Sequence, residues 1–121
     1  MYTVLRIAAA TGGEQQLRPL VEKLNAGRSS ALLEPRSRGG YVADLCDLPH
    51  WLDHANAILA FVVGSHGDLL AARKSGAIVT VDVAIEPGDR PDAAWSALTL
   101  SEELIAELAR VGARLLVTLY A

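Results

Sequence analysis

The chain has 121 residues, of which 51% are hydrophobic and 21% are charged, and its formal net charge is −3. This length predicts a single domain over residues 1–121, and this composition excludes a disordered chain. Because an acidic chain is not attracted to phosphate backbones, we expect no nucleic-acid partner.

Two further features indicate where the chain works. Cys46 is the single cysteine, so an internal disulfide is excluded and a reducing compartment is expected. The apolar run near the N-terminus is too short to span a membrane and lacks the charged start of a secretion signal. We therefore expect a cytoplasmic bacterial protein with no membrane partner.

Hydrophobic periodicity predicts the element order β-α-β-β-α-α-β-α-β. Alternating apolar residues indicate strands, and apolar residues three or four apart indicate helices. Strands are predicted at residues 2–9, 31–33, 41–46, 78–86 and 113–120, and helices at 14–24, 48–63, 68–75 and 102–111. The order starts as a ferredoxin-like pattern and adds one αβ unit. It predicts an α+β two-layer sandwich, with helices on one face of a mixed, mostly antiparallel sheet.

Local signals set several of these boundaries. Asp47 is a suitable N-cap for the helix over 48–63, and glycines at 64 and 67 are expected to break that helix. Ser101 is a suitable N-cap for the last helix, and Gly112 fits the left-handed position that ends it. The short strand at 31–33 is expected to end at Pro35.

The last predicted strand, residues 113–120, is apolar on one face and partly apolar on the other. Leu115, Val117 and Leu119 alternate along one face, and Leu116 makes the other face partly apolar. Strands buried on both faces have this pattern, so it predicts an interior strand and not an edge strand.

The C-terminal third carries the pattern of a strand, an acidic loop with proline, a capped helix, a glycine and a strand ending in tyrosine. This pattern resembles the uncharacterised bacterial proteins grouped as domain of unknown function 4279, with the distinctive match at about residues 78–120. The residues that carry it are Leu98, Leu100, Ser101, Glu103, Leu104, Leu108, Ala109, Gly112 and Tyr120. The resemblance implies a small α+β fold and supplies no catalytic residues.

The region from residue 46 to 54 holds the candidates for chemistry. His50 and His54 are four residues apart in a predicted helix, with Asp47 one turn earlier, and two histidines with a carboxylate suit zinc. The same spacing also fits two histidines on a solvated helix surface. Cys46 fits either a nucleophile with one of these histidines as base, or a small buried apolar residue. The sequence has no cofactor motif, so we expect no cofactor.

Two other groups of residues are candidates for binding. Arg36, Arg38 and Tyr41, together with Arg28, fit a basic patch beside a glycine turn, which would contact an acidic partner or a phosphate. The alternative is an ordinary solvated hairpin tip. Trp95 fits either an interface anchor or a side chain that covers the core edge.

Together these signals favour a non-enzymatic protein-binding module, with another protein or a second copy as its partner. By analogy, a toxin-neutralising immunity protein is one form of such a module. One alternative is a small hydrolase or metal-binding enzyme that uses Cys46, His50 and His54. Another is a structural homodimer, paired through sheet edges or helices, with no small-molecule site.

Overall fold

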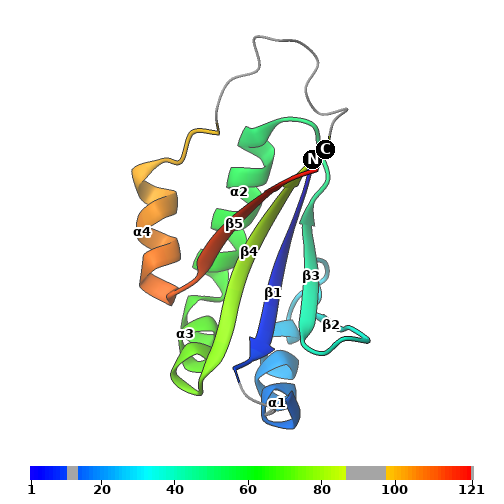
Figure 1. Cartoon of the computed structure of the whole chain (residues 1–121). Helices are drawn as coiled ribbons and strands as arrows, with labels where there is room; N and C mark the ends of the chain where they lie inside the picture. Colours follow the sequence, from blue (N-terminus) through cyan, green and yellow to red (C-terminus); the bar gives the residue numbers. More distant parts are fainter. Residues whose placement is uncertain (11–13, 87–97, 121) are drawn as a thin grey trace.

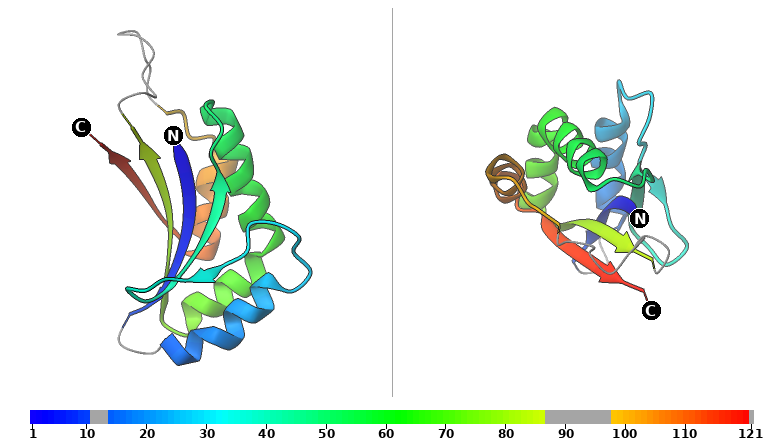
Figure 2. Two further views of the ribbon diagram at one scale, coloured as in Figure 1. Left: turned by 90° about the vertical axis from the view of Figure 1, so that its right-hand side faces the viewer. Right: turned by 90° about the horizontal axis from the view of Figure 1, so that it is seen from above.

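The computed structural model describes residues 1–10, 14–86 and 98–120. In these residues, helices cover one face of a five-stranded sheet (Figure 1, Figure 2). The elements in chain order are β1 (Tyr2–Ala9), α1 (Glu14–Asn25), β2 (Glu34–Pro35), β3 (Tyr41–Cys46), α2 (Trp51–Gly64), α3 (His66–Lys74), β4 (Ala77–Ile85), α4 (Glu102–Val111) and β5 (Arg114–Leu119). The predicted element order and the α+β class are confirmed.

The sheet has the strand order β2-β3-β1-β4-β5. The central strand β1 is antiparallel to both β3 and β4, and β2 is antiparallel to β3. The pair of β4 and β5 is parallel, since α4 connects them as a crossover. The sheet is therefore mixed and mostly antiparallel, as predicted.

The core lies between the helices and the sheet face that they cover. Leu5 of β1 pairs in register with Val81 of β4, and both side chains are 0% exposed. Alternation along each strand puts every second residue on this face. The helices contribute apolar side chains from the opposite layer: Leu17, Val21, Ile58, Phe61, Val62, Leu69, Leu104 and Leu108.

The ends of α4 agree with the sequence signals. The Ser101 hydroxyl accepts a hydrogen bond from the Leu104 backbone N–H at 3.1 Å. Gly112 has φ 68° and its N–H donates to the Ala109 carbonyl. These contacts satisfy backbone groups that a helix end leaves without partners.

The predicted start of α2 is wrong. The helix begins at Trp51 and its N-cap is His50, which makes no side-chain capping hydrogen bond. Asp47 is not the N-cap, because residues 47–50 belong to the link between β3 and α2. This extended link leaves the Leu48 carbonyl free to accept a hydrogen bond from His54.

The break after α2 lies at Ser65, between the two glycines that were expected to cause it. Gly64 is the last residue of α2, and Gly67 lies inside α3, which starts at His66. The two helices are bent by 73° from one another. In residues 14–86 and 98–120, no single helix is both long enough and apolar enough to cross a membrane. The bent pair α2 and α3 has this length and apolar content only when the two helices are counted together.

The predicted strand at 31–33 is also wrong. The strand in this region is β2, Glu34–Pro35. Ala31 has φ 53°, which lies in the left-handed region and is incompatible with a strand. The Asn25 side chain bonds to both the N–H and the C=O of Leu33, at 2.8 and 2.9 Å. An amide side chain thus takes the place of a neighbouring strand at Leu33.

The interior position predicted for the last strand is wrong as well. Among the described residues, β5 is the edge strand of the sheet and pairs with β4 only. The α4 helix packs mainly against α2 and α3, so it does not cover β5 fully. The acidic loop with proline that precedes α4 and the candidate binding residue Trp95 lie outside the described residues.

Candidate functional site

The two edges of the sheet differ in length and in chemistry. The β2 edge is two residues long and consists of Glu34 and Pro35. A short strand with a charge and a proline is a usual protection against unwanted strand pairing. The β5 edge is six residues long, from Arg114 to Leu119, and contains no proline or inward-facing charge. On the other side of the sheet, β2 pairs with Tyr41 and Val42 of β3 only, so within the described residues β5 has the longer strand edge without a partner.

Aliphatic side chains are exposed on both faces of β5. Val117 is 42% and Leu119 is 59% exposed on the face that turns toward the helices, and Leu116 is 49% exposed on the open face. Ile105, on the helix α4 that precedes β5 in the chain, is another exposed aliphatic side chain, with 51% of its surface accessible. Such a flat apolar edge is the kind of surface that pairs with another strand.

The open face of the sheet carries a polar network that extends to β5. Asp82 of β4 lies 3.5 Å from the Arg6 guanidinium and accepts a hydrogen bond from the Thr118 hydroxyl at 3.3 Å. A side-chain hydrogen bond with Tyr120 raises the pKa of Tyr2, and desolvation and nearby negative charge raise it further. These contacts connect β1, β4 and β5 across the open face and fix β5 in place.

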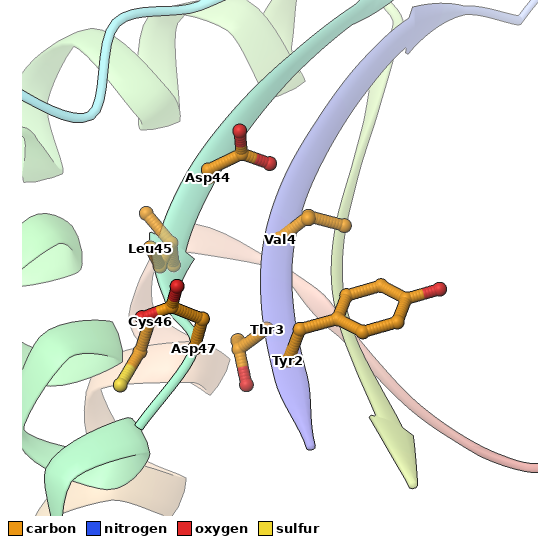
Figure 3. Close-up of a pocket in the computed structure, with 7 residues that line it drawn as sticks. All are labelled: Tyr2, Thr3, Val4, Asp44, Leu45, Cys46 and Asp47. Atoms are coloured by element: carbon orange, nitrogen blue, oxygen red, sulfur yellow. The ribbon is translucent and has the colours of Figure 1, made fainter. Parts of the chain in front are cut away.

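A hollow of about 390 Å³ lies where β1 begins and β3 ends. Figure 3 shows Asp44 and Cys46 on β3, Asp47 just after its end, and Tyr2 extending from β1 away from β3. A register shift next to Thr3 pairs this residue with Cys46. The residues that line the hollow carry a thiol, two hydroxyls and two carboxylates, and no histidine is among them.

His54 is 0% exposed, so it is not on the helix surface where the sequence placed it. Its Nε2 atom donates a hydrogen bond to the Leu48 carbonyl. Because Nε2 then carries the proton, Nδ1 accepts from the Thr3 hydroxyl at 2.8 Å. The ring also stacks on Trp51, with centroids 6.5 Å apart and planes at 8°. Both ring nitrogens are therefore used inside the fold.

These contacts affect two predictions for residues 46–54, the zinc site and the nucleophile with a histidine base. His50 is exposed at the start of α2, whereas His54 is buried, so the two do not share a face. No three His, Cys, Asp or Glu side chains in the described ranges lie close enough to hold a metal ion together. The Thr3 hydroxyl and His54 do have the contact of a nucleophile with its base. Thr3, however, is 1% exposed, so a substrate does not reach its oxygen in this conformation.

Of the residues predicted for a basic patch, three line one hollow and Arg28 does not. Arg36, Arg38 and Tyr41 line one hollow, and β1 adds Arg6, which the sequence analysis did not select. Arg6 was not predicted because its place in this hollow depends on the pairing of β1 with β3, which periodicity does not reveal.

Arg28 is instead part of the helical layer. Its guanidinium lies 3.7 Å from the centre of the Phe61 ring and donates to the Leu24 carbonyl and the Ser65 hydroxyl. Desolvation by burial lowers the pKa of Arg28. Arg28 thus connects the C-terminal end of α1 to the junction of α2 and α3 through these contacts.

Comparisons with protein-family models, with curated proteins and with solved structures found no match to this chain. The resemblance to domain of unknown function 4279 therefore stays a prediction.

Proposed function

We propose that the chain is a non-enzymatic protein-binding module that accepts an extended segment of its partner at the β5 edge. The observation that carries this proposal is that the sequence pattern of β5 does not fit the position of β5 in the sheet. The residues of β5 are apolar on one face and partly apolar on the other, which fits an interior strand, yet among the described residues β5 lies at the edge of the sheet. A partner strand would give β5 the interior position that its side chains fit.

Strand addition suits this edge in both its backbone and its side chains. An added strand supplies hydrogen bonds to the outer backbone groups of β5, and alternate side chains give specificity. Burying a half-exposed aliphatic side chain contributes on the order of 1 kcal/mol. Leu116, Val117 and Leu119 would each add such a contribution, and the polar network at Asp82 holds β5 ready for docking.

A second copy of the chain is one specific partner that the edge favours. In an antiparallel pair of β5 strands centred on Val117, Leu115 of each copy faces Leu119 of the other, and the two Val117 side chains meet. On the opposite face, Arg114 meets the aromatic ring of Tyr120, which attracts a guanidinium. The edge is thus complementary to itself in one register.

The test compares edge variants with a variant of another exposed aliphatic residue. Val117→Lys and Leu119→Lys place a charge on the edge, and Leu52→Lys places the same charge on α2, where Leu52 is 68% exposed. We expect the original chain and Leu52→Lys to bind the same partner, and the two edge variants to lose it. Circular dichroism of each variant is the control that it is folded.

Two measurements separate the kinds of partner. Sedimentation velocity over a range of protein concentrations detects a second copy, and affinity capture from a bacterial extract followed by deuterium exchange of β5 detects another protein. Monomeric sedimentation of the original chain would exclude the second copy. Equal binding by the Leu52 variant and both edge variants would overturn the edge proposal.

A further inference from the structure

A hollow of about 300 Å³ lies where the turn between β2 and β3 folds against β1. Three arginines line it: Arg6 comes from β1, and Arg36 and Arg38 come from the turn. We call it the arginine hollow. It lies at the β2–β3 side of the sheet, away from the β5 edge, so it is independent of the binding surface proposed above.

The backbone of the turn keeps the arginines together. The Arg36 N–H donates to the Gly40 carbonyl, and the Gly39 N–H donates to the Arg36 carbonyl, each at 3.0 Å. Gly40 has φ 75°, and a Cβ atom there would lie 2.9 Å from the Ile7 carbonyl oxygen. A glycine is therefore needed for the turn to approach β1, and this approach brings Arg36 and Arg38 to Arg6.

The arginine hollow is positively charged although the chain as a whole has a net charge of −3. Its lining includes no aspartate or glutamate. Arg6 has an acidic partner, Asp82, at 3.5 Å, and its side chain is still 49% exposed. Within the described residues, neither Arg36 nor Arg38 forms an ion pair. The charges of the turn arginines are thus available to a ligand.

Phosphate chemistry fits this arrangement better than a carboxylate does. A carboxylate has two oxygens whose lone pairs lie in one plane, so it accepts arginines only within that plane. A phosphate group offers more acceptor oxygens and accepts from arginines on different sides. We propose that the arginine hollow binds a small phosphate-bearing molecule.

The surroundings limit the size of that molecule. The hollow is at the small end of the range of ligand pockets. Glu34 and Asp44 line a neighbouring hollow, and Asp82 lies on the open face beyond Arg6. These carboxylates would repel an extended polyanion such as a nucleic acid, while a single phosphate or diphosphate fits among the arginines.

The test is a calorimetric titration of the whole chain with inorganic pyrophosphate. We expect saturable binding at one site, and a loss of about tenfold or more in affinity for each of Arg36→Ala and Arg38→Ala. Arg36→Lys keeps the charge but loses the paired donors, so we expect it to weaken binding as well. Arg18→Ala, which removes an exposed arginine on α1, is the control and should leave the affinity unchanged.

Further titrations identify the chemical class. Succinate, a dicarboxylate, should bind at least about tenfold more weakly than pyrophosphate, and vesicles containing phosphatidic acid should not retain the chain in sedimentation. Equal affinity of the original chain and the Arg36 and Arg38 variants for pyrophosphate would overturn the site. Preference for succinate or retention on the vesicles would overturn the assignment to a small phosphate-bearing molecule.

Discussion

At the scale of the residue, His54 shows how tertiary structure changes the role of a side chain. The histidine lies on α2, but its two hydrogen-bond partners come from β1 and from the link before the helix. Buried polar atoms are costly unless they are paired, and here both ring nitrogens are paired. His54 thus connects the central strand to the start of α2, and its chemistry is structural.

The hydrogen bond between Thr3 and His54 can be removed by Thr3→Val, which keeps the shape of the side chain. The change leaves the buried Nδ1 atom of His54 without a donor. We expect a loss of about 1–3 kcal/mol in the free energy of unfolding, measured by urea denaturation. Thr80→Val, on the open face of β4, is the control and should change stability by less than about 0.5 kcal/mol. Equal effects of both substitutions would contradict the structural role of His54.

At the scale of the element, α4 and β5 differ in how far local sequence determines them. The caps of α4 are made by residues adjacent to it in the chain, so the sequence predicts its start and end correctly. The position of β5 depends on which other strands are present, and periodicity carries no information on that. The apolar pattern of β5 fits a strand with a neighbour on each side, whereas the described residues supply one neighbour, β4.

The N-cap of α4 can be tested by substituting Ser101. Ser101→Ala removes the acceptor of the Leu104 N–H, so we expect a loss of about 1 kcal/mol in the free energy of unfolding. Ser101→Asp restores an acceptor and suits the positive end of the helix dipole, so it should retain the stability of the original chain. Thermal or urea unfolding of the two variants measures the difference. A stable Ser101→Ala variant would show that tertiary packing alone fixes this helix end.

At the scale of the whole molecule, the two faces of the sheet have separate tasks. The face under the helices is apolar and forms the core. The open face carries Arg6, Asp82 and Thr118 in one network, and the side chain of Tyr120 raises the pKa of Tyr2 there. β1 begins and β5 ends at the same end of the sheet, so the two tyrosines connect distant ends of the chain across β4 (Figure 1).

The contact between the tyrosines predicts a pH dependence. The hydrogen bond to Tyr120 is the largest cause that raises the pKa of Tyr2 above 10.0. A raised pKa means that the protonated phenol stabilises the fold below pH about 10, and that this contribution is lost as pH rises through the raised value. Tyr120→Phe should lower the pKa of Tyr2 toward its ordinary value, as measured by NMR titration of labelled tyrosine. An unchanged Tyr2 titration would show that the two rings do not interact.

The sequence by itself determined the element order, the α+β class and the ends of α4. These follow from side-chain periodicity and from caps made by neighbouring residues, which are local properties. It failed for Asp47, because α2 begins only at Trp51, and for residues 31–33, where the Asn25 side chain takes the backbone hydrogen bonds of Leu33.

Tertiary structure alone decided which residues meet. The antiparallel pairing of β1 with β3 brings Arg6 to Arg36 and Arg38, and the packing of α2 on the sheet brings His54 to Thr3. The strand order places β5 at an edge although its residues fit an interior strand. Contacts between residues far apart in the chain depend on strand order and register, and neither is encoded in the local pattern that sequence reading uses.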